Sequence, residues 1–277
     1  MRSWRAVIGI LVASVLMVWA YISLDRWQRQ LIFHGNSYMA ETPQDRGLGY
    51  SDRWIDVENG KIHGWWIPAT SPRAPAALFF HGNAGTISSQ IEQLVLLHNA
   101  GFAVLAVDYR GYGSSTAIQP SEASVYADAQ AAWPRFLQLT PDASMRMIYG
   151  HSLGGAVAID LATRVTGVDA LVAEGTFTSI VAEATNIFPT WWPVSWLVTQ
   201  RFASDDKVEG LHMPKLFIHC VDDEVIPGSM SEELYRLSPQ PKAQLVIPGG
   251  NHNNCPAFRG VGLDQRHAPD RETGPII

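Results

Sequence analysis

The sequence predicts an α/β protein built on a mainly parallel β-sheet of about eight strands. Short, continuous apolar runs alternate along the chain with segments in which apolar residues recur at helical spacing. Strands with such runs are typical of a parallel sheet, because helices cover both of its faces. With 277 residues, of which 47% are hydrophobic, the chain is long enough for one large domain and too apolar for global disorder. We find no internal repeat.

The first segment, residues 1–30, is predicted to be a membrane anchor with its flank. Arg2 and Arg5 precede an apolar run over residues 7–24. As a helix this run is about 27 Å long at roughly 1.5 Å per residue, which nearly matches the hydrocarbon core of a bilayer. It is longer than the ~7–15 apolar residues of a signal peptide, so we favour an uncleaved anchor over a cleaved signal and over a buried helix. The basic residues before the run favour a cytoplasmic N-terminus, with the bulk of the chain on the extracytoplasmic (periplasmic) side.

After a polar connector over residues 31–50, strands and helices are expected in regular order. Asn59-Gly60 indicates an antiparallel hairpin between strands 54–58 and 61–67. Helices are expected around residues 91–98, after an N-terminal cap at Ser121, and over 153–165. The remaining strands are expected from their apolar runs at 76–80, 102–107, 145–149, 170–173, 216–219 and 244–247.

Between residues 178 and 210 the alternation of strands and helices stops. This stretch follows the sixth expected strand and is rich in aromatic residues and prolines. We predict that it forms a lid over a binding pocket and that its tryptophans contact the substrate; a helix pair packed on the core is the alternative. These tryptophans are Trp191, Trp192 and Trp196. Residues 258–277 are polar and are expected to be a loose tail, so the folded domain is expected to span 51–257.

Residues 150–155, Gly-His-Ser-Leu-Gly-Gly, contain the Gly-x-Ser-x-Gly spacing of a nucleophile elbow. An expected strand precedes the motif and an expected helix follows it, which is the context that it requires. Ser152 would then lie at a helix N-terminus, where free amides favour developing negative charge. Of the nine histidines, we choose His252 as the base, because it lies in the loop after the last strand. His34 and His63 are expected at surface or connector positions.

The base needs a carboxylate to orient it. Asp222, Asp223 and Glu224 follow the seventh expected strand, and Glu174 ends the sixth. The residues alone leave the choice among these four open.

An oxyanion hole needs two backbone N–H groups. Leu153, directly after the serine, supplies one, and Asn83 in the glycine-rich loop 81–85 is best placed for the other. The same loop lacks the G-x-x-x-x-G-K pattern of a phosphate-binding loop, so we do not assign it that role.

Taken together, these blocks resemble the α/β-hydrolase superfamily, and within it the small membrane-anchored members grouped with serine aminopeptidases and lysophospholipase-like enzymes. The resemblance covers about residues 50–256. It implies the α/β-hydrolase fold and Asp223 as the acid, four residues before Pro227, although Cys220 stands where the family usually has glycine. The blocks are FHGNAG at 80–85, DYRGYGSS at 108–115, GHSLGG at 150–155, and the segments around Asp223 and His252.

The predicted function is a serine hydrolase that cleaves carboxylic esters or thioesters of a small-molecule acyl substrate through an acyl-enzyme. No metal or organic cofactor is expected. A serine aminopeptidase-like activity on amides is the alternative, and a non-catalytic membrane-anchored scaffold is the alternative of another class. The net charge of −6 and the lack of basic runs with interleaved aromatics argue against nucleic-acid binding.

The two cysteines, Cys220 and Cys255, are not in a metal-binding or C-x-x-C pattern. An exported location would permit a disulfide between them, and two unpaired cysteines are an equally acceptable reading. The sequence does not indicate an oligomeric state.

Overall fold

The computed structural model describes residues 2–187 and 191–255, and its centre is an eight-stranded sheet. The strand order is β1-β2-β4-β3-β5-β6-β7-β8. The β1–β2 and β2–β4 pairs are antiparallel, and every other pair is parallel. This confirms the predicted mainly parallel sheet. The strands are β1 (Ser51–Val57), β2 (Gly60–Ile67), β3 (Ala76–Phe80), β4 (Ala103–Val107), β5 (Arg146–His151), β6 (Ala170–Glu174), β7 (Lys215–Cys220) and β8 (Lys242–Ile247).

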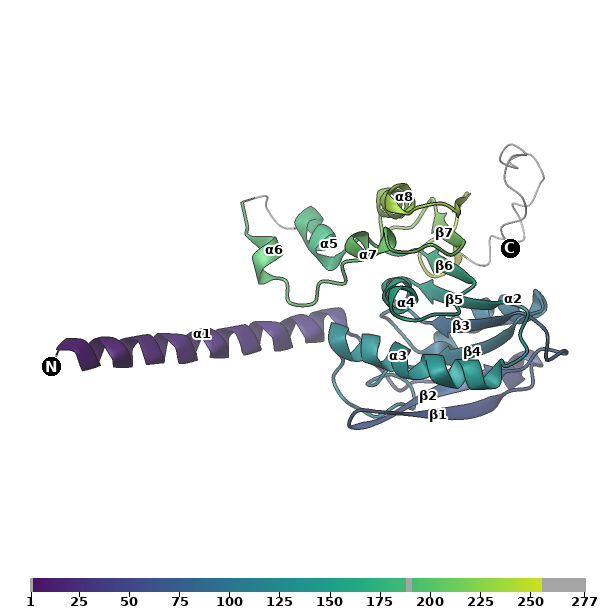
Figure 1. Ribbon diagram of the computed structural model, residues 1–277, viewed down its shortest axis with the longest axis horizontal. Coiled ribbons are helices and arrows are strands. Elements are labelled where there is room, and N and C mark those ends of the chain that lie inside the picture. The colour runs from purple at the N-terminus through teal and green to yellow at the C-terminus, as the bar shows by residue number, and fades with distance from the viewer. Residues whose placement is uncertain (1, 188–190, 256–277) are drawn as a thin grey trace.

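Helices cover both faces of the sheet (Figure 1). The helices around the sheet are α2 (Ile91–Asn99), α3 (Glu122–Leu139), α4 (Leu153–Arg164) and α8 (Gly228–Leu237), with the 3-10 helices η1 (Pro43–Arg46) and η2 (Ile87–Gln90). Along β3, Leu78 and Phe80 pack in the same core cluster as α3, α4 and α8. Ala77 and Phe79 point the other way, into the cluster that contains α2. Because successive side chains of a strand face opposite sides, a strand covered on both faces is apolar throughout.

Local signals in the sequence place the element boundaries. Asn59 turns the first hairpin with a φ of 63°, a conformation that Asn tolerates better than most residues. Ser121 caps α3, since its side chain accepts a hydrogen bond from the backbone N–H of Ser124.

Helix α1 (Arg2–Ile32) extends away from the sheet as a single long rod (Figure 1). Its segment Val7–Ile32 is long and apolar enough to cross a membrane. The last turns of α1 dock on the rest of the chain. The Gln28 side-chain amide donates to the carbonyl of Leu197 at 2.7 Å and accepts from the N–H of Thr199 at 2.8 Å. The helix is therefore fastened to the domain by buried hydrogen bonds at its C-terminal end.

The segment between β6 and β7, residues 178–210, forms three short helices outside the sheet, and we call it the inserted segment. Its helices are α5 (Ile180–Ile187), α6 (Val194–Leu197) and α7 (Asp205–Val208). In Figure 1, α5 and α6 lie on the side of the molecule from which α1 extends. The residues expected to form a loose tail, 258–277, lie outside the described residues.

Candidate active site

Ser152 lies in a strained turn between the end of β5 and the start of α4. Its φ of 55° and ψ of −122° are rarely adopted by residues with a side chain. Gly150 and Gly154 make this turn possible, because a Cβ on Gly150 would collide with the Gly154 carbonyl and a Cβ on Gly154 with the Phe80 carbonyl. The Gly-x-Ser-x-Gly spacing is thus a steric requirement of the way in which β5 meets α4.

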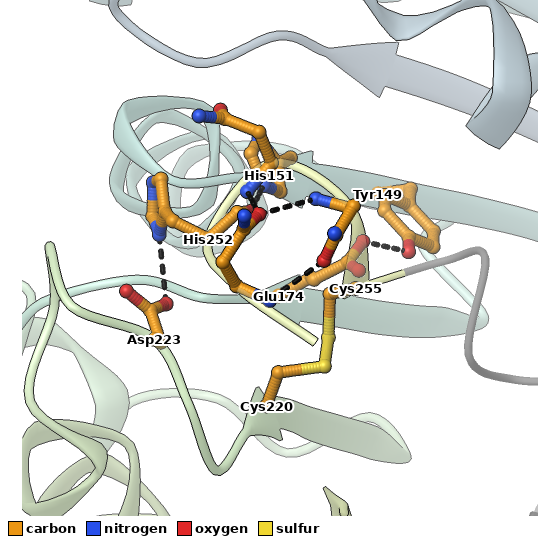
Figure 2. The surroundings of a disulfide bond; sticks show 10 residues. Tyr149, His151, Glu174, Cys220, Asp223, His252 and Cys255 are labelled. Atoms are coloured by element: carbon orange, nitrogen blue, oxygen red, sulfur yellow. Dashed lines mark hydrogen bonds and ion pairs between the residues drawn. A yellow bond between two sulfur atoms is a disulfide. The ribbon is translucent and has the colours of Figure 1, made fainter. Parts of the chain in front are cut away.

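A continuous chain of hydrogen bonds links Ser152, His252 and Asp223. His252 Nε2 lies 2.8 Å from Ser152 Oγ, and His252 Nδ1 lies 2.7 Å from Asp223 Oδ2. Figure 2 shows Asp223 facing the imidazole of His252. A carboxylate only accepts hydrogen bonds, so Nδ1 carries the proton and donates to Asp223. In the neutral ring Nε2 is then an acceptor, and it faces the hydroxyl of Ser152.

The Asp223 carboxylate is held in its charged form. Its Oδ1 accepts the backbone N–H groups of Val225 at 2.9 Å and of Ile226 at 2.8 Å. Burial acts to raise the pKa of Asp223, but the hydrogen bonds from His252 and these two amides outweigh burial and leave the pKa below its usual value. A charged Asp223 accepts the Nδ1–H of His252 and so fixes the orientation of the ring.

The other three carboxylates considered for the acid lie elsewhere. Asp222 and Glu224 are exposed to solvent. Glu174 is fully buried, and its carboxylate accepts a hydrogen bond from the Tyr149 hydroxyl (Figure 2). The structure therefore brings only Asp223 of these four to the imidazole of His252.

The two expected oxyanion donors lie beside Ser152. Leu153 is the first residue of α4, and the first N–H groups of a helix lack an intrahelical acceptor. Asn83 is held by its side-chain oxygen, which accepts hydrogen bonds from the N–H of His34 and from the Tyr112 hydroxyl, both at 3.1 Å. The neighbouring Gly82 packs so closely that a Cβ there would lie 3.1 Å from Ser152 Cβ. The glycine-rich loop thus lies directly against the serine.

A cavity of about 410 Å³ opens over Ser152 and is lined by His252, Asn83 and Leu153 as well. Ile32 and His34 also line it, although the sequence placed both residues in a connector. The remaining apolar wall includes Phe177 and Ile180, and Glu183 adds a half-buried carboxylate. Burial, and then the charge of Asp223, raise the pKa of Glu183.

The tryptophans of the inserted segment are not where the sequence predicted. None of Trp191, Trp192 and Trp196 lines the cavity over Ser152. The side chains of Trp191 and Trp196 are 79% and 90% exposed, and Trp192 lines a different cavity beside α1. The reason is that α6 packs toward the end of α1 and not over the edge of the sheet. Within the described residues, Ile32, Phe177 and Ile180 provide the apolar surface that we had expected from the tryptophans.

Cys220 and Cys255 form a disulfide with 5.8 Å between their Cα atoms. Cys220 ends β7 three residues before Asp223, and Cys255 lies three residues after His252 (Figure 2). The bond therefore ties the histidine loop to the strand that carries the acid. His151 Nε2 donates to the His252 carbonyl at 3.1 Å and holds the same loop from the other side.

Within residues 2–187 and 191–255, no three or more His, Cys, Asp and Glu side chains are grouped so that they could hold a metal ion.

Comparisons with known proteins agree with this fold. The family model "Serine aminopeptidase, S33" matches residues 71–204. The uncharacterized protein Rv2307c of Mycobacterium tuberculosis is 33% identical over 264 residues, which cover 94% of this chain and 91% of that protein. Lysophosphatidylserine lipase ABHD12 of Xenopus tropicalis is 30% identical over 241 residues, 79% of this chain and 62% of the lipase. The structure of the Pyrococcus furiosus esterase Pf2001 covers 82% of this chain and 94% of the esterase, with a TM-score of 0.66 and 20% identity.

The fold and the site together define a hydrolase with a mainly parallel sheet and a serine at the end of its central strand. The chain belongs to the α/β-hydrolase superfamily. This confirms the resemblance that the four sequence blocks predicted. The likeness to the archaeal esterase, at 20% identity, shows the fold alone.

We predict that the double variant Cys220→Ser/Cys255→Ser is destabilised by about 4 kcal/mol, because the disulfide closes a loop of intermediate length in the unfolded chain. Hydrolase activity should also fall, by about 10–100-fold, since a displaced His252 no longer meets Ser152. Urea unfolding and steady-state kinetics well below the unfolding midpoint measure the two effects. Unchanged values of both would show that the disulfide does not position the histidine loop.

Proposed function

We propose that this protein is a serine hydrolase that cleaves carboxylic esters or thioesters through an acyl-enzyme intermediate. Ser152 is the nucleophile, His252 the general base and acid, and Asp223 the carboxylate that orients the imidazole. The observation that supports this assignment most strongly is the pair of hydrogen bonds at 2.8 and 2.7 Å that joins the three side chains. Acyl transfer by a serine needs such a row of hydrogen-bonded side chains beside two backbone N–H donors.

The first half of the proposed reaction forms the acyl-enzyme. Ser152 Oγ attacks the carbonyl carbon of the substrate, and His252 Nε2 takes the hydroxyl proton. The charge of Asp223 stabilises the resulting imidazolium. The N–H groups of Asn83 and Leu153 bind the oxyanion of the tetrahedral intermediate. When the intermediate collapses, His252 gives its proton to the leaving alcohol or thiol, and the acyl group stays on Ser152 as an ester.

The second half releases the acid by the same groups. A water molecule enters the cavity and loses a proton to His252 as it attacks the acyl carbon. The second oxyanion forms at the same two amides. His252 then returns the proton to Ser152 Oγ, which restores the free enzyme. Every proton transfer in this scheme uses His252, so no metal or organic cofactor takes part.

An ester with an apolar acyl group is the substrate that we favour. The cavity wall near Ser152 is apolar at Ile32, Phe177 and Ile180, and the similar ABHD12 protein is named a lysophosphatidylserine lipase. The match to the serine aminopeptidase model supports amide hydrolysis as the second candidate. A non-catalytic scaffold has no need for a serine in a strained turn beside a correctly oriented histidine, and we place it behind both activities.

We further propose that α1 anchors the protein in a membrane and that the catalytic domain lies on the extracytoplasmic, periplasmic side. The apolar span Val7–Ile32 supports the anchor. Arg2 and Arg5 before the span favour a cytoplasmic N-terminus. The disulfide between Cys220 and Cys255 fits an oxidising compartment.

Labelling with a fluorophosphonate probe tests the nucleophile. We expect the wild-type protein to be labelled and Ser152→Ala not to be, with ester hydrolysis reduced by about 10⁴-fold or more because the acyl-enzyme cannot form. Ser114→Ala removes an exposed loop serine and serves as the matched control. Equal labelling of wild type and Ser152→Ala would refute the serine hydrolase proposal and favour the scaffold.

A substrate panel separates ester from amide hydrolysis. We expect kcat/KM for p-nitrophenyl esters to exceed that for aminoacyl-naphthylamides by at least about 100-fold, since the wall near Ser152 is apolar at Phe177 and Ile180 and the raised pKa of Glu183 weakens its carboxylate as a partner for a substrate ammonium group. Steady-state kinetics on the purified full-length protein measure the ratio. Turnover of the amides alone would reverse the preference while leaving the serine mechanism in place.

The anchor and its orientation are tested in a bacterium that expresses the full chain. We expect the protein to stay in membranes after alkaline carbonate extraction, because an apolar span of this length is inserted and not merely adsorbed. Protease added to spheroplasts should digest the catalytic domain while a cytoplasmic marker protein survives. Complete release by carbonate contradicts the anchor, and protection of the domain in intact spheroplasts contradicts the orientation.

A further inference from the structure

A second cavity, of about 240 Å³, lies between the end of α1 and the inserted segment. Its walls are apolar, with Leu24 and Leu31 on α1 facing Ala184 and Val194 on the inserted segment. Apart from the rings of two tryptophans, Gln28 is the only polar side chain among its lining residues, and both ends of its amide are engaged by the backbone of the inserted segment. We call this space the anchor groove. Among the described residues that line the groove no side chain is charged, so the groove is unsuited to a charged or strongly hydrated ligand.

The anchor groove adjoins the cavity over Ser152. Ile32 and Ile180 line both spaces, Ile32 at the last residue of α1 and Ile180 at the first residue of α5. These two isoleucines therefore stand between the cavity over the serine and the groove on the flank of α1, and a hydrocarbon chain that reaches Ser152 from the groove passes between them.

The surroundings of the groove suit a bilayer interface. Its α1 wall belongs to the end of the apolar span. On the opposite side, the side chains of Trp191 and Trp196 are 79% and 90% exposed, and the Trp192 ring lies against the groove at 42% exposure. Large exposed indole rings are typical of the boundary between lipid and water, where one end of the ring is apolar and the other wet. The exposure of these tryptophans, which do not line the catalytic cavity, is therefore consistent with contact with the membrane surface.

We propose that the anchor groove is an acyl-chain subsite. It holds one hydrocarbon chain of an ester lipid that enters laterally from the leaflet, and the chain leads its ester carbonyl to Ser152. This inference rests on the proposed esterase function and specifies its substrate as a lipid of the membrane in which α1 is embedded. Each methylene that the groove keeps from water favours binding by about fourfold, so chain length should control kcat/KM.

The docked end of α1 explains why the subsite is preformed. The hydrogen bonds of Gln28 to Leu197 and Thr199, and a further one of 2.8 Å from the Gln200 side chain to Asp25, set the spacing between the helix and the inserted segment. Phe33, the residue after α1, is buried and packs on Phe202 of the same segment. The membrane helix therefore forms one wall of the binding site and is more than a tether.

Filling the groove from each wall tests the proposal. The full-length protein is reconstituted in phosphatidylcholine vesicles, and kcat/KM is compared for p-nitrophenyl palmitate and p-nitrophenyl butyrate. We expect Ala184→Trp and Leu31→Trp each to lower the palmitate-to-butyrate ratio by about 10–100-fold, because the bulky ring occupies the space of the long chain. Thr185→Trp places the same ring on the next, exposed position of α5 and is the matched control, with an expected wild-type ratio.

The outcomes separate the subsite from the proposed function. A wild-type ratio in both groove variants overturns the subsite while ester hydrolysis stands. A wild-type protein that hydrolyses neither ester contradicts the esterase function, and the groove is then examined by binding alone.

The binding measurement uses Ser152→Ala in vesicles that contain a phosphatidylcholine with a photoactivatable diazirine in its acyl chain. We expect cross-links at the groove residues of α1 and α5, and their loss in a Ser152→Ala/Ala184→Trp protein. Cross-links confined to residues 7–22 of α1 would overturn the subsite, since those positions face the bilayer and not the groove.

Discussion

The strained backbone at Ser152 is the constraint on which the rest of the site depends. Its conformation is held by the sheet, because the N–H of Ser152 donates to the carbonyl of Glu174 on the neighbouring strand at 2.8 Å. Close passage of α4 over β5 requires Gly150 and Gly154, and the same passage leaves the amide of Leu153 free at the helix N-terminus. One turn thus presents the Ser152 hydroxyl to the cavity and places the Leu153 amide beside it.

Asp223 and His252, the partners of Ser152, lie about 70 and 100 residues further along the chain. A disulfide and hydrogen bonds hold them beside the serine. Asp223 and His252 lie in the loops after β7 and β8, and the disulfide between Cys220 and Cys255 joins these loops beside the sheet. The hydrogen bonds of Asp223 keep its pKa low, so the carboxylate remains charged opposite the imidazole. The two backbone amides and the hydrogen bond from His252 therefore together keep the Asp223 carboxylate in place and charged.

Local patterns were enough to predict the sheet and the elements around it. The ends of the expected strands differ from the observed ones by at most three residues, because each buried strand is a distinct apolar run. The patterns did not predict the burial of residues whose contacts come from distant segments of the chain. His63, expected near the surface, is 4% exposed, with its ring 2.8 Å from Asp52 and 3.8 Å from Asp108. No short-range pattern in the sequence indicates such a contact. The same holds for Ile32 and His34, which line the cavity over the serine.

The order of residues was enough to predict the fold, the superfamily and the placement of Ser152 in a strand-to-helix turn, because these depend on periodicity and on a motif of adjacent residues. The residue pattern alone left open the choice among four carboxylates, for which the family resemblance implied Asp223, and it left open the pairing of the two cysteines. Only the tertiary structure decided that Asp223 meets His252, that the cysteines bond, and that the tryptophans lie beside α1 and not over the serine. Each of these depends on how separate elements pack against one another. The spacing of residues along the chain does not show which distant segments will be in contact.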